Sequence, residues 1–330
     1  MTQAETARGP LAFLLRLFCW GMVTVTFAFL LEVYLVHWQG QSSARALLSG
    51  GTGGIFAAAG YLVAGMLALF QAIRGAARSL HADAETISAI VAYLARGAFF
   101  AILFIGVADA LISFLRVERL LTPLFGAGIA TELGQTAFRG PNIHMPLAAV
   151  GFIVAFFTRT VGFIWLALLV VIAQLSLVIG RFVFSYEQAF MTDLVRTWYA
   201  ALFLFASAYT LVEEGHVRVD VFYSTMSERA RALVNGVGAA VLGMPLCWVI
   251  LVYGAATSAS PIVGPFLRFE QGQQSFGLMT KYLLAVYLGV FAVTMLLQFA
   301  AVILNSAGIW RGERASGDAP MPLNQPAMGS

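Results

Sequence analysis

The sequence predicts an all-α, polytopic integral membrane protein with about seven or eight transmembrane helices. Of its 330 residues, 60% are hydrophobic and only 11% are charged, and the mean hydropathy is +0.85. Soluble domains carry about 25% charged residues, so the composition excludes a soluble globular protein. A helix needs about 20 mostly apolar residues to cross a bilayer. Candidate segments lie near 11–38, 53–73, 87–115, 144–158, 160–184, 194–212, 230–258 and 278–307.

The first apolar segment is expected to be a retained transmembrane helix. It is longer than the apolar core of a signal peptide, which usually has about 7–15 residues. Arg16 and Glu32 lie toward the two ends of this segment. Long charged side chains near helix ends can reach the membrane surface while their stems stay in the apolar layer. We therefore expect both side chains to extend to the interface.

The region 144–184 leaves the number of spans open. Only the three residues Thr158–Thr160 divide it, which is a tight turn between two full crossings. One crossing preceded by an interfacial or re-entrant helix gives seven spans, and two crossings give eight. Cytoplasmic loops are enriched in Lys and Arg, but the arginines here do not decide on which side the N-terminus lies.

A connector without a long apolar run separates the third and fourth segments. It extends from Arg116 to His144, contains Pro123 and Pro141, and carries scattered charge. We expect a short surface helix in it and a domain boundary near its end. The predicted division is an N-terminal transmembrane extension of about three spans at 1–140, a second helical region at 141–310, and a disordered tail at 311–330, where apolar residues are few.

Asp109 is the ionisable residue that lies deepest within a predicted span. Charged groups inside a membrane are costly and mark contacts or functional sites. Arg96 belongs to the same segment but is 13 residues away, or about 20 Å along a helix, so the two cannot pair. Three roles stay open for Asp109: a bond to a neighbouring helix of this chain, a contact with a partner protein, or an ion relay.

The sequence contains no enzyme signature, and we predict no catalytic residue, cofactor site or metal site. It lacks the HExxH, GxSxG, Walker A and GxGxxG patterns. Cys19 and Cys247 are not in a CxxC pair, and His37, His81, His144 and His216 lie at span ends or in loops, which disfavours a membrane haem. The net charge of +3 comes from residues near the ends of apolar runs, so nucleic acid is not expected as a partner.

One feature of the sequence bears on transport by this chain alone. Paired helices that are interrupted by Gly or Pro would point to a transport site at the middle of the membrane. We find no such matching pair in the sequence. The absence disfavours the interpretation that this chain is itself the translocating unit.

A polar segment, "LVEEGHVRVDVFYSTMSERARALV" at 211–234, interrupts the second half of the chain. His216, Arg218 and Asp220 alternate with valines, which places the polar groups on one side of an extended segment. Thr225 and Glu228 fit a capping box that restarts a helix, with Ser227 as the alternative cap. Two interpretations stay open: a well-capped cytoplasmic turn, or a docking surface for a partner.

The stretch "EEGHVRVDVFYSTMSERARALVNGVGAAVLGMPLC" resembles the small (DctQ-like) membrane subunit of tripartite ATP-independent periplasmic (TRAP) transporters. The preceding "RFVFSYEQAFMTDLVRTWYAALFLFASAYTL" and the following "FEQGQQSFGLMTKYLLAVYLGVFAVTMLLQ" are similar to the flanking spans of that subunit. The resemblance covers about Gly162 to Asn305. The chain departs from the usual four-span subunit by about 140 additional N-terminal residues.

The resemblance implies a non-enzymatic, multi-pass protein of the bacterial inner membrane. In that family, a periplasmic substrate-binding protein delivers an organic anion of the carboxylate type. The large membrane subunit, the expected partner here, holds the substrate and sodium sites. The small subunit stabilises it among the membrane lipids and binds no substrate. The alternatives are a stand-alone carrier or channel and a membrane anchor of another complex.

The resemblance also assigns expected roles to individual residues. Those expected to fix the cytoplasmic turn and to support assembly are Glu214, His216, Arg218 and Asp220. Those expected to anchor two spans at the outer face are Arg181, Glu187 and Arg196. None of the seven is expected to bind substrate.

Overall fold

The structure is a computed structural model that describes residues 9–159, 163–212, 223, 225–272, 278 and 281–313. The regular elements in these residues are all helices, as predicted. Six helical segments are long and apolar enough to cross a membrane, and 167–183 forms a shorter apolar helix. The all-α, polytopic prediction is confirmed.

The N-terminal part of the chain forms α2 (Pro10–His37), α3 (Ile55–Arg74), α4 (Leu80–Val117), α5 (Leu121–Leu133), α6 (Thr136–Arg139) and α7 (Met145–Phe157). Short 3-10 turns at Ala44–Ser49 and Gly75–Ala77 flank α3. The C-terminal part forms α8 (Phe163–Val183), α9 (Ala189–Val212), α11 (Glu228–Gly238), α12 (Met244–Ala255), α13 (Val263–Leu267) and α14 (Lys281–Arg311).

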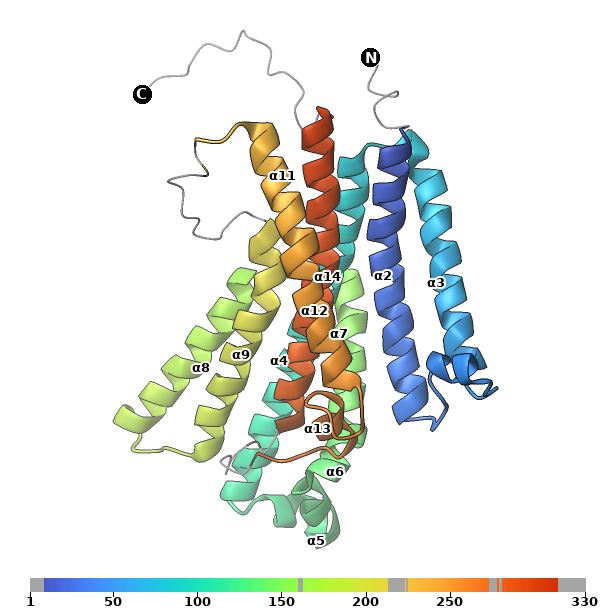
Figure 1. Ribbon diagram of the computed structural model, residues 1–330. Coiled ribbons are helices and arrows are strands. Elements are labelled where there is room, and N and C mark those ends of the chain that lie inside the picture. Colours follow the sequence, from blue (N-terminus) through green and yellow to red (C-terminus); the bar gives the residue numbers. More distant parts are fainter. Residues whose placement is uncertain are drawn as a thin grey trace, which may run out of the picture.

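Helices α4 and α14 form the centre of the bundle (Figure 1). Helix α14 packs against α2, α4, α9, α11 and α12, and α4 also packs against α7 and α9. Helices α2 and α3 lie on one side and the α8–α9 hairpin on the other, while α5, α6 and α13 gather at one end (Figure 1). The start of α2 and the end of α14 lie together at the opposite end.

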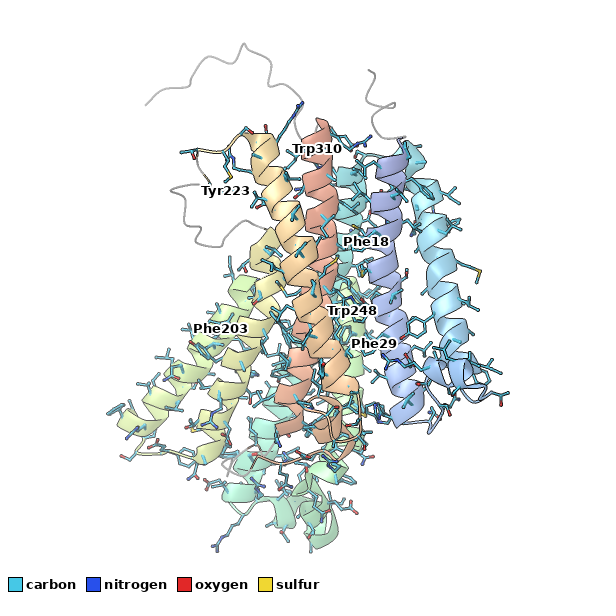
Figure 2. All side chains as sticks on the ribbon, in the orientation of Figure 1. Phe18, Phe29, Phe203, Tyr223, Trp248 and Trp310 are labelled. Atoms are coloured by element: carbon cyan, nitrogen blue, oxygen red, sulfur yellow. The ribbon has the colours of Figure 1, made fainter. Side chains whose placement is uncertain are left out.

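Large apolar side chains fill the contacts between these helices. Phe29 of α2 and Trp248 of α12 meet edge to face with ring centroids 5.6 Å apart (Figure 2). This arrangement is favourable for aromatic pairs. The central helices also bury small residues such as Ala292 and Ala300, each 0% exposed, which let helices approach closely in a membrane.

The ambiguous region 144–184 forms two separate helices. Helix α7 ends at Phe157 and packs against α4, whereas α8 begins at Phe163 and packs against α9. Gly151 makes the first contact possible, because a Cβ atom at this position would lie only 2.5 Å from the backbone nitrogen of Ala101. The connector before α7 contains the helix α5, which is kinked at Gly126 where φ is 82°.

Two helical segments share a π-helical turn ahead of a proline, although neither helix is interrupted there. Five-residue π-helical turns at Gly140–His144 and Ala239–Gly243 each lead directly into a Met-Pro-Leu sequence, Met145–Leu147 and Met244–Leu246. Proline has no N–H and clashes with the preceding turn. A π-helical turn is one local adjustment that accommodates such an interruption. In both places the chain stays helical through the turn.

Candidate functional site

Helix α4 is bonded to the rest of the bundle by polar groups along its whole length. Near its start, His81 contacts Asn305 of α14, with 2.6 Å between Nδ1 and Oδ1. Further along, Gln298 of α14 donates to the Ser88 hydroxyl at 3.3 Å, and Trp198 of α9 donates to a carbonyl oxygen of α4 at 3.3 Å. Near its end lies a buried ionic cluster.

This cluster, the Asp109 cluster, consists of Asp109, Arg139, His144 and Tyr282. Arg139 Nη1 donates to Asp109 Oδ1 at 2.7 Å, and each side chain is 1% exposed. His144 Nε2 lies 2.8 Å from the same oxygen, and His144 Nδ1 is bonded to the Tyr282 hydroxyl. The arrangement connects α4, the α6–α7 segment and the first turn of α14.

Local structure places Arg139 and His144 beside Asp109. Arg139 ends α6 and His144 ends the π-helical turn that follows, so both point to the same carboxylate. Gly140 allows the close approach, because a Cβ atom there would lie 2.1 Å from the ring of Phe269. Arg139 also donates from Nη2 to the carbonyl oxygen of Leu278 at 3.1 Å.

A second buried ion pair links α2 to α4 at the other end of the bundle. Arg16 Nε donates to Asp83 Oδ2 at 2.6 Å, and the side chains are 1% and 4% exposed. Arg16 also donates to the carbonyl oxygen of Arg78. The expectation that Arg16 reaches the membrane interface was therefore wrong, because a carboxylate on a neighbouring helix satisfies it internally. Glu32 is half-buried and accepts from Tyr61 Oη and the Ala44 backbone.

The end of α14 covers the start of α4. Glu313 Oε2 accepts a 2.8 Å hydrogen bond from the backbone nitrogen of Leu80, and its carbonyl oxygen lies 3.3 Å from His81 Nε2. The side chain is only 4% exposed. The first residues of the expected tail are thus packed against the bundle, and 314–330 lie outside the described residues.

The residues expected to anchor two spans at the outer face surround the α8–α9 turn. Arg181 at the end of α8 pairs with Glu187 at 3.3 Å, with both side chains about half exposed. Arg196 lies 3.9 Å from Asp193 on the same helix. The structure brings Arg181 and Glu187 together, but it places Arg196 with a different carboxylate.

Tyr186 in the same turn donates to Glu118 Oε1 at 2.7 Å. Desolvation and the neighbouring Glu118 carboxylate raise the pKa of Tyr186 to about 12. The hydroxyl therefore stays protonated at neutral pH. It connects the α8–α9 turn to the end of α4.

The four residues expected to fix the cytoplasmic turn, Glu214, His216, Arg218 and Asp220, lie outside the described residues. The sequence offered two N-caps for the helix that follows them, and the structure has one of the two. Ser227 caps α11, and its hydroxyl accepts from the Ala230 backbone nitrogen at 3.3 Å. About two turns later, Asn235 donates to the Tyr223 hydroxyl at 2.8 Å.

Comparison with protein families gives a match over 167–308, from within α8 to near the end of α14. The matching model is that of tripartite ATP-independent periplasmic transporters, DctQ component. These residues form a DctQ domain. The resemblance predicted from about 162 to 305 is confirmed, with apolar helices added before it. Comparison with curated proteins finds no match, and comparison with solved structures finds none.

The match associates residues 167–308 with the small membrane component of TRAP transporters. A transporter component is not an enzyme, which agrees with the sequence prediction. The described residues also contain no group of three or more His, Cys, Asp or Glu side chains placed to hold a metal ion. Cys19 and Cys247 are both buried and unbonded to each other.

The polar contacts of α4 join the N-terminal helices to the DctQ domain. Asn305, Gln298 and Trp198 belong to the DctQ domain and bond to α4. Tyr282 of the same domain bonds to His144 within the Asp109 cluster. Sequence reasoning identified Asp109 but not its partners. Arg139 and His144 are 30 and 35 residues away in sequence, and no local pattern connects them to Asp109.

Proposed function

We propose that this chain is a scaffold subunit of a sodium-coupled TRAP transporter that takes up an organic anion of the carboxylate type. The match of 167–308 to the DctQ component carries this proposal. In it, a periplasmic binding protein delivers the anion, and the large membrane subunit holds the substrate and sodium. The chain described here stabilises that subunit in the bacterial inner membrane.

The contacts inside the chain support a static role. Two buried ion pairs join different helices: Arg16 with Asp83, and Arg139 with Asp109. Removing one partner of a buried ion pair strongly destabilises a protein, because the other charge is left buried and unpaired. A bundle fixed in this way suits a support for a moving partner better than a moving element.

Roles for the untested residues follow from the same proposal. Glu214, His216, Arg218 and Asp220 would form the cytoplasmic turn that contributes to assembly. Arg181, Glu187 and Arg196 would hold the α8–α9 turn at the outer face, where Arg181 already pairs with Glu187. In this assignment, no side chain of this protein contacts the transported anion.

Reconstitution tests the proposal directly. The large subunit would be placed in proteoliposomes with and without this chain, and uptake of a carboxylate would be followed with the binding protein and a sodium gradient. We expect uptake only when the chain, the binding protein and sodium are all present. Equal uptake without this chain would contradict the scaffold role. Uptake that does not depend on the sodium gradient would contradict the coupling of transport to sodium.

One observation favours a second candidate, a stand-alone carrier. The two π-helical turns that precede Met-Pro-Leu form a pair of Pro-containing helices, and such pairs can mark a transport site. Against it, both helices continue through the turn, and His144 in one of them is bound within the Asp109 cluster. Transport by the purified chain alone in proteoliposomes would establish the carrier.

A further inference from the structure

Helix α8 has the smallest contact with the rest of the described chain among the long helices. It packs against α9, and no other helix makes a comparable contact with it. In Figure 1 the α8–α9 hairpin leans away from the central helices, with α8 on its outer side. Much of the α8 surface is therefore available to lipid or to another protein.

A polar residue interrupts this apolar surface. Gln174 is exposed, and none of its amide atoms bonds to a residue that the structure describes. Its neighbour Ala173 is 7% exposed, whereas Val171 and Leu175 are 59% and 54% exposed. Gln174 thus lies beside the α9 contact and outside it.

The position of Gln174 along α8 is deep within the apolar segment. The helix runs from Phe163 to Val183, and the nearest charged residue in it is Arg181. Seven residues of helix span about 10 Å. An amide that faces hydrocarbon has no hydrogen-bond partner and is unfavourable there, whereas glutamines between transmembrane helices bond across the contact.

Residues spaced by seven lie on one face of a helix. Ala167, Gln174 and Arg181 are spaced in this way and form what we call the Gln174 stripe. It combines a small residue, an amide and a cation. Such a face matches a helix of another protein better than it matches lipid tails.

The N-terminal helices pack against another face of the DctQ domain and leave the Gln174 stripe uncovered. Helices α2 and α4 pack against α14, α4 also packs against α9, and buried hydrogen bonds hold α4 there. The stripe lies within the segment that matches the DctQ component, whereas α2 to α7 lie before it. A partner that the chain shares with other DctQ proteins should bind the shared domain.

We propose that the large TRAP membrane subunit docks on the Gln174 stripe and hydrogen-bonds to the Gln174 amide. This inference rests on the proposed function for its partner and adds the place of contact. The outer face of α11 and α12 is also exposed, at Val241, Leu242 and Leu246 among others. That face is apolar at these positions and offers no comparable unpaired group.

Site-specific photo-crosslinking in native membranes tests the contact. A benzophenone amino acid would replace Gln174 in the full-length chain, expressed together with the large subunit. The matched control carries it at Leu62 of α3, which is 69% exposed and lies outside the DctQ domain. We expect an adduct with the large subunit at position 174 and none at position 62. Adducts at position 174 with lipid alone, or with a second copy of this chain, would overturn the inference.

A substitution that removes the amide but keeps a side chain of similar size gives an independent measurement. Gln174→Leu keeps α8 apolar, and it should weaken assembly roughly 3- to 20-fold, the range of measured hydrogen bonds between transmembrane helices. Gln71→Leu on α3 is the matched control and should leave assembly unchanged. Unchanged assembly of Gln174→Leu would contradict the hydrogen bond.

The two proposals fail in different ways. If the wild-type chain captures the large subunit but position 174 forms no adduct with it, the docking inference fails and the proposed function stands. If the wild-type chain captures no large subunit, both fail.

Discussion

Arg139 and Asp109 form an ion pair of 2.7 Å between two helices, with both side chains 1% exposed. Asp109 Oδ2 and Arg139 Nε are buried without hydrogen-bond partners among the described residues, so each charge depends mainly on the other. His144 adds a second bond to the same carboxylate oxygen as Arg139. The pair joins α4 to the segment that leads into α7, at the end of the bundle where α14 begins.

Asp109→Asn should destabilise the protein by about 3–5 kcal/mol, because it leaves the Arg139 guanidinium buried without a counter-charge. Thermal or denaturant unfolding in detergent would measure the loss. The double variant Asp109→Leu/Arg139→Met removes both charges and should recover much of it, since apolar replacement of a whole buried pair is often nearly neutral. A double variant that is no more stable than Asp109→Asn would contradict this account.

Gly151→Ala should separate α7 from α4. The new Cβ atom would lie 2.5 Å from the Ala101 backbone nitrogen, and overpacking of this kind costs about 1–3 kcal/mol. Gly65→Ala is the matched control, because a Cβ atom there meets nothing within 4 Å. It should be neutral or slightly stabilising, since Ala favours helix more than Gly. Melting temperatures of the two variants check the prediction, and equal values would refute the close contact.

Glu313→Ala should destabilise the protein by about 1 kcal/mol, the typical effect of losing a helix cap. The carboxylate accepts from the Leu80 backbone nitrogen at the first residue of α4. Glu313→Gln keeps an acceptor oxygen and should lose less. Differential scanning fluorimetry would compare the three proteins. If both variants are as stable as the wild type, the end of α14 does not cap α4.

Glu270 should make a pH-dependent contribution to the stability of the loop before α14. Its hydrogen bonds from Lys281 and Arg268 hold the pKa of the carboxyl below its ordinary value, which is about 4.3. A lowered folded-state pKa stabilises the protein above the unfolded pKa, and this contribution is lost as the pH falls through the folded value. Melting temperatures of wild type and Glu270→Gln should therefore differ at pH 7 and converge as the pH falls through the lowered folded-state pKa of Glu270. The difference should also shrink with added salt, because the pair is exposed.

His216→Ala and Asp220→Ala should weaken assembly with the large subunit and leave substrate preference unchanged. This follows from the proposed role of the cytoplasmic turn rather than from any described contact. Co-purification yield and competition between substrates would be measured for each variant. A changed substrate profile with normal assembly would overturn that role.

Hydropathy predicted the position of most helices, because each span needs a long apolar run. It placed the start of α4 near residue 87, whereas the helix begins at Leu80. The first turn of α4 contains His81 and Asp83, whose polarity is satisfied by Asn305 and Arg16 on other helices. Hydropathy averaged over consecutive residues does not detect hydrogen-bond or ion-pair partners on other helices.

The same reason explains what was missed in the buried clusters. Arg16 was expected at the interface because its partner Asp83 is 67 residues away in sequence, and no local pattern connects the two residues. Asp109 was recognised as a costly buried charge with a bond to a neighbouring helix among its open roles, but Arg139 and His144 were not identified as its partners. The DctQ resemblance, by contrast, depends on a continuous segment and could be found from the sequence.

Gentle detergent extraction of the tagged chain from its native membrane, followed by mass spectrometry, shows whether the chain is the small subunit of a larger complex. If it is, a much larger polytopic membrane protein should be recovered with it in a ratio near one to one. Recovery of the chain alone, from complexes that remain intact during extraction, would contradict its role as the small subunit of a TRAP transporter.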